Sequence, residues 1–453
     1  MSQSTRIPTY FFLGIGGIGM SALARYLLAQ DIQVLGYDRT KTELTTTLET
    51  EGAKIFYDEV VAIHALSDFS NEGIHVIYTP AISNQSKLFT YLTSNDFTLQ
   101  KRAALLGEIT RSGKCLAVAG THGKTTTTAI LTHILKEAKV GFTAFLGGIL
   151  NDINSNFYST GNEYFVVEAD EFDRSFLQLH PHAAVITSMD ADHLDIYGTK
   201  ENFEQTFYDF ANQVSDELWV EESLSISGKK LGFGKDSTAS IQKLEVIDGS
   251  YVFDLVLEDR VYSNIQFSLP GRHNVFNAVA ALSLAISNFP EKAGEFVAAL
   301  KSFSGVKRRF NYLLKTPNRI IIDDYAHHPT EINAAFQGAK EMHPNENLMV
   351  IFQPHLFSRT ENFAEDFALS LAQFDEICLL EIYPARELPI EGVDASFLLQ
   401  KIKAKNKKII SKESITASIA ATSCRVVLML GAGDIGDEAQ KVKNYFISNA
   451  EVV

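Results

Sequence analysis

The sequence predicts an α/β protein with three domains. Short apolar runs, typical of buried strands, alternate with helical patterns along most of the chain, which favours parallel sheets covered by helices. Most of these runs end in glycine-rich or polar segments. The length of 453 residues exceeds a single core, and roughly 100–200 residues per domain allows two to four domains. We place the domains at residues 1–100, 101–303 and 304–453.

The first domain is predicted to be Rossmann-like. It begins with a strand at residues 10–13, a glycine turn, a helix at 20–30 and a second strand at 33–37. A further buried strand at residues 75–78 ends at Thr79-Pro80. Strands separated by helices in this way predict a parallel sheet.

The central domain is predicted to be of the phosphate-loop ATPase type. Its strand at residues 115–119 runs into a glycine loop and a helix from 124 to about 137. Strands at 164–167 and 183–186 follow, and the short alternating segments between 216 and 268 predict a small antiparallel sheet. An alanine-rich helix at residues 275–286 closes the domain.

The third domain returns to strand–helix alternation and is predicted to be Rossmann-like. Its expected strands are residues 320–322, 348–352, 376–380 and 426–430, the last leading into Gly431-Ala432-Gly433-Asp434.

Composition excludes several classes of function. A net charge of -15 argues against nucleic-acid binding, which selects for basic surfaces. The chain has no apolar run of membrane-spanning length and no signal-type N-terminus. Its three cysteines are far apart, which fits a reducing compartment. We therefore expect a cytoplasmic protein.

The first glycine motif, Gly14 to Gly19, follows a strand and opens a helix. With Asp38 at the end of the next strand it matches a dinucleotide fingerprint, in which glycines let a pyrophosphate approach the helix N-terminus. Any nucleotide with a pyrophosphate would satisfy it, and so would a tight turn without a ligand. NAD is therefore only one interpretation.

The second glycine motif is the strongest single signal. In Gly120-Thr121-His122-Gly123-Lys124-Thr125-Thr126, a Lys-Thr pair follows a glycine at a strand–helix junction. Lys124 would neutralise the outer phosphates of a nucleotide and the Thr125 hydroxyl would ligate Mg²⁺. The full pattern has a glycine where Val118 stands, so the loop is a shortened variant.

Acidic segments follow two strands of the same domain. Residues 168–173 (EADEFD) and 190–195 (DADHLD) stand where a parallel sheet gathers its ligands, and carboxylates there suit Mg²⁺. Two such segments beside one phosphate loop predict a polyphosphate with more than one Mg²⁺. Solvated acidic loops are the alternative.

Other polar groups extend the predicted site. Asn274 and Asn277, three apart at a helix start, can face one base edge. In the third domain, strand ends carrying Tyr325, His327 and Arg359 predict a site for a small anion such as an amino-acid carboxylate.

The ordered set of motifs resembles the Mur ligases of peptidoglycan synthesis over essentially the whole chain. The set is GIGGIGMSALA, GTHGKTTTTA, EADEFDRSF, DADHLDIYG, PGRHNVFNA, GVKRRF, DDYAHHPTE and FQPHLFSRT. Within the family it is most similar to the branch that acts on UDP-N-acetylmuramate and L-alanine.

The resemblance implies an ATP-dependent amide ligation. ATP would phosphorylate the lactyl carboxylate of UDP-N-acetylmuramate, and the amine of L-alanine would displace phosphate, giving UDP-N-acetylmuramoyl-L-alanine, ADP and phosphate. The implied cofactors are ATP and two Mg²⁺ ions, for which Mn²⁺ can substitute. The implied context is cell-wall synthesis, and with it cell shape and division. The partners are these small molecules, with no nucleic acid or membrane, and the chain would be a monomer or a weak homodimer.

The resemblance also implies roles for individual residues. Lys124, Glu168, His193 and Arg309 would be catalytic, and Thr125, Glu168 and His193 would hold metal. The substrate contacts would be made by three groups: Gly16, Gly17, Ile18, Gly19, Asp38, Thr79 and Pro80 for UDP; residues 120–126, Asn274, Asn277, Arg309 and Asp324 for ATP; Tyr325, His327 and Arg359 for L-alanine. Some relatives carry Arg where this chain has Leu356, so Arg359 is expected to bind more of the carboxylate.

Three alternatives stand beside this interpretation. A ligase that adds a tripeptide to the same sugar nucleotide shares both glycine motifs. A nicotinamide-dependent oxidoreductase would explain Gly14 to Gly19 but not the phosphate loop. A nucleotide-gated binding protein would use the loop without catalysis. Because the expected site draws on all three domains, we also expect domain closure.

Overall fold

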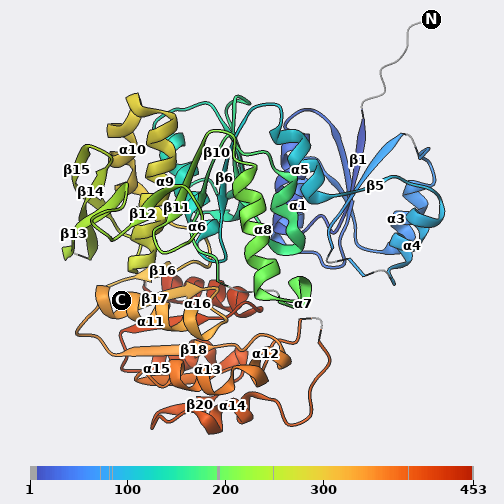
Figure 1. Cartoon of the computed structure of the whole chain (residues 1–453). Coiled ribbons are helices and arrows are strands. Elements are labelled where there is room, and N and C mark those ends of the chain that lie inside the picture. The colour runs from blue at the N-terminus through green and yellow to red at the C-terminus, as the bar shows by residue number, and fades with distance from the viewer. Residues whose placement is uncertain are drawn as a thin grey trace, which may run out of the picture. The chain divides into compact units, whose positions relative to one another are not determined.

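The computed structural model describes residues 8–71, 73–80, 82–83, 85–190, 194–247, 249–385 and 387–450 (Figure 1). By compactness the chain divides into two units, which are described separately. The first comprises Met1–Gln242, Asp254–Ser263 and Phe276–Ser302, and the second comprises Lys243–Phe253, Asn264–Val275 and Phe303–Val453. The described residues form three sheets, which confirms the predicted α/β class.

The first sheet is parallel throughout, in the order β3-β2-β1-β4-β5. Its strands are β1 Thr9–Leu13, β2 Gln33–Tyr37, β3 Lys54–Phe56, β4 Ile74–Tyr78 and β5 Leu99–Lys101, and its helices are α1 Ile18–Leu28, α2 Glu43–Thr50, α3 Glu59–Leu66, α4 Lys87–Ser94 and α5 Arg102–Thr110. β1 is buried on both faces, with Phe12 in one core cluster and Phe11 and Leu13 in another. This explains why β1 is a continuous apolar run rather than an alternating one.

The second sheet has the order β15-β14-β13-β12-β11-β10-β6-β9-β7-β8. Its strands are β6 Lys114–Ala119, β7 Thr143–Leu150, β8 Ser155–Ser159, β9 Tyr164–Ala169, β10 Ala183–Ile186, β11 Glu217–Glu221, β12 Lys229–Gly232, β13 Ala239–Ile247, β14 Ser250–Leu257 and β15 Arg260–Phe267. The associated helices are α6 Lys124–Glu137, α7 Leu194–Tyr197, α8 Lys200–Asn212, α9 Arg272–Asn288 and α10 Ala293–Ala299, with short 3-10 turns η1 Phe172–Gln178, η2 Pro290–Lys292 and η3 Leu300–Ser302.

The predicted antiparallel sheet between residues 216 and 268 is only partly correct. β11 pairs with β10 and β12 in parallel, and β12 pairs with β13 in parallel, so these strands extend the central sheet. β13, β14 and β15 are consecutive neighbours in the sheet and are joined by two-residue connections, which make each pair an antiparallel hairpin. The sequence between β11 and β12 lacks a helix, and this absence concealed the parallel crossover.

The third sheet has the order β16-β17-β21-β18-β19-β20. It contains β16 Asn311–Lys315, which is antiparallel to its neighbour, and the parallel strands β17 Ile320–Asp324, β18 Leu348–Phe352, β19 Glu376–Leu379, β20 Lys407–Ile409 and β21 Val426–Leu430. Its helices are α11 Pro329–Met342, α12 Phe357–Asn362, α13 Ala364–Leu371, α14 Ala395–Lys401, α15 Ile415–Ala421 and α16 Ile435–Ala450, with the 3-10 turn η4 Lys412–Ser414.

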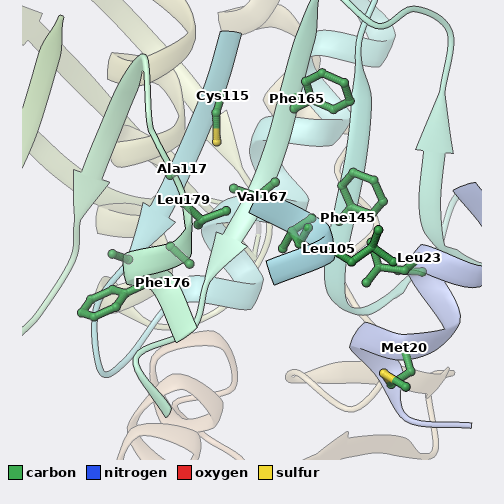
Figure 2. Packing of buried hydrophobic residues seen from close by; sticks show 14 of the residues in the cluster. Met20, Leu23, Leu105, Cys115, Ala117, Phe145, Phe165, Val167, Phe176 and Leu179 are labelled. Atoms are coloured by element: carbon green, nitrogen blue, oxygen red, sulfur yellow. The ribbon is translucent and has the colours of Figure 1, made fainter. Parts of the chain in front are cut away.

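A shared core joins the first sheet to the second within the first unit. Leu23 of α1, Leu105 of α5 and Phe145 of β7 belong to one buried cluster with residues of β6 and β9 (Figure 2). Buried hydrogen bonds also join the two sheets. The Asn156 amide donates to the Ile18 carbonyl oxygen at 2.6 Å and to the Ser21 hydroxyl at 2.9 Å. The start of α1 is thereby fixed beside the second sheet.

Strand register explains how the motifs assemble. In the first sheet Leu13 pairs with both Tyr37 and Tyr78, so the segments after β1, β2 and β4 leave the sheet together. In the second sheet Ala119 is level with both Ala169 and Ile186. Parallel sheets gather ligands at this edge. No helix of the described residues is long and apolar enough to cross a membrane.

Candidate active site

The phosphate loop has a backbone that requires glycine at two positions. Gly120 has φ +132° and Gly123, which caps α6, has φ +82°, both in the region that side chains rarely adopt. A Cβ on Gly120 would lie 2.8 Å from the backbone nitrogen of Ser188. The loop therefore packs closely against the segment that contains Ser188. The free N–H groups of the first turn of α6 follow directly after the loop.

Residues after β10 brace the phosphate loop. The Thr121 hydroxyl donates to the Asp190 carbonyl oxygen at 2.9 Å, and the His122 N–H donates to the Ser188 hydroxyl at 2.8 Å. Asn277 is buried on α9 and lies against the loop, since a Cβ on Gly123 would be 3.2 Å from its side-chain carbon. These contacts fix the loop against β10 and α9.

Lys124 is paired with a buried carboxylate that the sequence did not single out. Its Nζ lies 2.6 Å and 2.9 Å from the two carboxylate oxygens of Glu171 and also donates to the Gly120 carbonyl oxygen at 2.7 Å. The Glu171 side chain is 3% exposed. Burial raises the pKa of Glu171, which the charge of Lys124 opposes. Glu171 therefore offsets the charge of Lys124 within the loop.

Thr125 and Glu168 meet at the start of α6. The Thr125 hydroxyl donates to Oε1 of Glu168 at 3.0 Å, and the backbone N–H of Gly147 donates to Oε2 at 3.1 Å. The structure thus brings together two of the three predicted metal ligands. The third, His193, lies outside the described residues.

The first glycine turn is organised by Asp38. Its carboxylate accepts the Gly16 N–H at 2.8 Å and the Thr40 N–H at 3.1 Å. Gly17 then caps α1, whose first residue, Ile18, is 36% exposed. Asp38 shapes the turn, a use of this carboxylate that the motif alone did not indicate.

A pocket of about 300 Å³ in the first unit joins the first glycine turn to the second sheet. Its lining includes the predicted UDP contacts Gly17, Ile18, Gly19, Thr79 and Pro80, and also Glu168. The lining residues are Gly17, Ile18, Gly19, Met20, Ala22, Leu23, Thr79, Pro80, Lys101, Arg102, Ala103, Leu106, Phe145, Leu146, Gly147, Glu168, Asp170, Phe172 and Ser175. The other two predicted UDP contacts, Gly16 and Asp38, are not among these lining residues and are hydrogen-bonded to each other in the turn.

The second unit carries the predicted amino-acid residues at one sheet edge. Leu430 of β21 pairs with Asp324 of β17 and Phe352 of β18, so the segments after these strands are neighbours. Asp324 accepts the Phe310 N–H at 2.6 Å and the Ala326 N–H at 2.7 Å. Burial raises the pKa of Asp324 to about 6, although the charge of Arg309 opposes the shift. Asp324 therefore holds the backbone at Phe310 and Ala326 by hydrogen bonds and also interacts with the charge of Arg309.

Aromatic rings and cations surround this edge. The guanidinium carbon of Arg309 lies 5.4 Å from the centre of the Tyr325 ring. His327 Nδ1 lies 2.9 Å from the Tyr325 carbonyl oxygen, which can only accept, so that nitrogen carries a proton. The rings of His327 and His355 are 5.9 Å apart.

At this edge, Nη1 of Arg359 and Nδ1 of His355 are buried and have no hydrogen-bond partner among the described residues. Burial and the charges of His327 and Arg359 lower the pKa of His355 to about 4, so its ring is neutral at pH 7. Unsatisfied buried donors are costly, and a guanidinium edge without a partner suits a carboxylate. His355 stands in the motif FQPHLFSRT, but the sequence assigned it no role of its own.

Asn274 and Asn277 both lie in the first turns of α9 and are buried. The Asn274 amide donates to the Pro270 carbonyl oxygen at 2.5 Å. The predicted helix start is thus correct, and Asn274 also stabilises it.

Comparison with known proteins agrees with these motifs. Sequence profiles of the Mur ligase family match residues 9–114 (Mur ligase family, catalytic domain), 118–285 (Mur ligase middle domain) and 308–434 (Mur ligase, glutamate ligase domain). The chain belongs to the Mur ligase family.

Among its Mur ligase relatives is UDP-N-acetylmuramate–L-alanine ligase from Christiangramia forsetii, which is 50% identical over 99% of this chain and 100% of that protein. The protein of the same name from Flavobacterium psychrophilum is 46% identical over 97% of this chain and 98% of its own length. A crystal structure of UDP-N-acetylmuramate-alanine ligase from Thermotoga maritima superposes with a TM-score of 0.84 at 28% identity, covering 97% of this chain and 99% of that one. The predicted branch of the Mur ligase family is confirmed.

Proposed function

We propose that this Mur ligase joins L-alanine to the lactyl carboxylate of UDP-N-acetylmuramate at the expense of ATP. The observation that carries the proposal is the 300 Å³ pocket, because the same cavity is lined by the first glycine turn and by Glu168. Glu168 in turn accepts a hydrogen bond from Thr125 of the phosphate loop. A sugar nucleotide bound at the turn would thus extend its lactyl carboxylate toward ATP at the phosphate loop.

The reaction needs two steps because a carboxylate is a poor electrophile. A carboxylate oxygen attacks the γ-phosphorus of ATP, and the bond to the bridging oxygen breaks to release ADP. The alanine amine then attacks the acyl carbon, loses a proton, and phosphate leaves with the electrons of the C–O bond. The first step joins two anions, so it requires concentrated positive charge.

The phosphate loop is proposed to supply part of that charge. Gly120 to Gly123 and Thr126 would hold the phosphates, and Lys124 would leave Glu171 to contact the γ-phosphate. Asn274, Asn277, Arg309 and Asp324 remain proposed contacts for the rest of ATP, with Arg309 a second source of positive charge.

Magnesium fits the residues present at this loop. The Thr125 hydroxyl and the Glu168 carboxylate are oxygen donors of the kind that Mg²⁺ prefers, and they lie 3.0 Å apart. These two residues would hold one ion and His193 a second, with Mn²⁺ as a substitute. The metal would neutralise charge on the transferring phosphoryl group.

A cytoplasmic location and a monomer or weak homodimer remain predictions.

Gly147→Ala should disrupt this metal site by displacing the Glu168 carboxylate. A Cβ at position 147 would lie 2.5 Å from the carboxyl carbon of Glu168, so the carboxylate would have to move. We expect activity to fall at least about tenfold and the Mg²⁺ concentration for half-maximal activity to rise, since supporting contacts of metal ligands are worth about 10–100-fold. Titration of phosphate release with MgCl₂ measures both. Gly294→Ala is the control, because a Cβ there meets nothing within 4 Å; equal behaviour of the two variants would contradict the prediction.

The amino acid is proposed to bind at the edge formed by Tyr325, His327 and Arg359. Nη1 of Arg359, which is buried and has no partner among the described residues, suits an amino-acid carboxylate. Because position 356 is Leu in this chain, Arg359 is proposed to bind more of that carboxylate.

Phosphate release with UDP-N-acetylmuramate and ATP tests the proposed function. We expect release that depends on L-alanine, together with a product whose mass equals that of the sugar nucleotide plus alanine less water. The tripeptide L-alanyl-γ-D-glutamyl-meso-diaminopimelate in place of L-alanine should give no release. A response to the tripeptide alone would replace the proposal with the tripeptide-adding ligase.

A further inference from the structure

Arg102, the first residue of α5, is one of the residues that line the 300 Å³ pocket. It lies directly against the first glycine turn, since a Cβ on Gly19 would be 2.8 Å from Nη1 and 3.2 Å from the guanidinium carbon. Any side chain at position 19 would displace Arg102. The two residues are 83 apart in the chain, so the motif by itself could not indicate this contact.

The guanidinium of Arg102 makes no hydrogen bond to any described residue. Its nearest counter-charge is Oδ2 of Asp170, 3.7 Å from Nη2, which is beyond hydrogen-bond length. The Arg102 side chain is only 20% exposed, and that of Asp170 is 40% exposed. A half-buried guanidinium therefore retains its forked donors, with one loosely held carboxylate nearby.

The neighbouring cation differs from Arg102. Lys101 is held by Asp173 at 2.7 Å, and that hydrogen bond raises the pKa of Lys101. Of two adjacent cations at the start of α5, one is committed to a protein carboxylate and the other is not. This difference indicates a ligand for Arg102 rather than a purely structural role.

Resting on the proposed function, we infer that Arg102 binds the diphosphate of the sugar nucleotide and that Asp170 holds its place when the pocket is empty. The planar fork of Arg matches two phosphate oxygens, which a Lys cannot reproduce. Contact with Gly19 puts that fork beside the turn where the backbone can approach a pyrophosphate. The diphosphate carries more negative charge than one carboxylate and displaces Asp170 from the guanidinium.

The inferred role is one of binding, because the diphosphate of the sugar nucleotide takes no part in the bonds that form and break. Binding lost equally in the ground state and the transition state raises KM and leaves kcat nearly unchanged. For Arg102→Met we expect KM for UDP-N-acetylmuramate to rise about 10- to 150-fold, the range for charge-assisted hydrogen bonds. KM for ATP and for L-alanine should stay within about twofold. Arg102→Lys should recover only part of the loss, because it restores the charge but not the fork.

A binding experiment separates this inference from the proposed function. The full chain in metal-free buffer is titrated with UDP and with uridine by calorimetry. Wild-type protein should bind UDP more tightly than uridine, and Arg102→Met should lose most of that difference. Asp170→Asn should tighten UDP binding a few-fold, an effect of opposite sign that loss of folding cannot produce. Arg111→Met, at the end of the same helix and paired with His180 at 2.6 Å, is the control and should match wild type.

The outcomes are distinct. If wild type does not distinguish UDP from uridine, or if Arg102→Met and Arg102→Lys both keep the difference, the inference is wrong. If the UDP difference behaves as expected while no L-alanine-dependent phosphate is released, the proposed reaction fails and the diphosphate site stands. If Arg102→Met does not fold, Arg102→Lys and Asp170→Asn decide the matter.

Discussion

Lys124→Ala should reduce ATP-dependent ligation by about three orders of magnitude or more, because phosphoryl transfer between two anions depends on charge at the γ-phosphate. The same change also leaves the buried carboxylate of Glu171 without its paired cation. The side chain of Glu171 is only 3% exposed. Removal of one partner of a buried pair costs about 3–5 kcal/mol of folding stability.

The two effects can be separated with a second substitution. Burial already raises the pKa of Glu171, and loss of Lys124 raises it further. A raised carboxyl pKa means that the folded state prefers the proton, so Lys124→Ala should lose stability as pH rises above about 4.3, the pKa of unfolded Glu. Lys124→Ala/Glu171→Gln should melt at a higher temperature than Lys124→Ala above about pH 4.3 and should lose this pH dependence, but it should not regain the activity.

Lys136→Ala, on the same helix and 23% exposed, is the matched control and should retain turnover. Phosphate release and thermal melting are measured on all three variants. If the double variant recovered ligation, Lys124 would act through stability alone, and its proposed contact with ATP would be refuted.

Glu168→Gln should give the second largest loss, about two to three orders of magnitude in kcat at a Mg²⁺ concentration that saturates wild type. The amide keeps the size of the side chain but removes the negative charge that a hard cation requires. Much higher Mg²⁺ should restore part of the activity, because the Thr125 hydroxyl remains.

Glu163→Gln tests whether the effect is specific, since Glu163 precedes the same strand and is exposed. It should leave both turnover and the Mg²⁺ titration unchanged. A Glu168→Gln variant with the wild-type Mg²⁺ requirement and reduced kcat would show that Glu168 does not bind metal.

The sequence determined the elements and the positions of the motifs. The glycine pattern placed the turn between β6 and α6, and the apolar runs ending at Val167, Ile186 and Leu430 were strands. Such features are readable because the period of an element and the chemistry of its ends are local. The family followed from the order of the motifs alone.

Tertiary structure decided which motifs meet. That Ala119 stands level with Ala169 and Ile186 follows from the strand order β10-β6-β9, which no local pattern specifies. The parallel pairing of β11 and β12 was missed for the same reason, because a short connection between them resembled a hairpin.

The individual partners were also set by the fold. Glu171 lay within a motif already noted, yet only the structure aimed it at Lys124 rather than at a metal. Gly147 against Glu168 and Arg102 against Gly19 join residues from separate elements, 21 and 83 positions apart. The sequence by itself thus established which chemical groups this ligase carries and at which strand ends. Their pairing depended on strand order and side-chain packing, because distance along the chain does not fix distance in space.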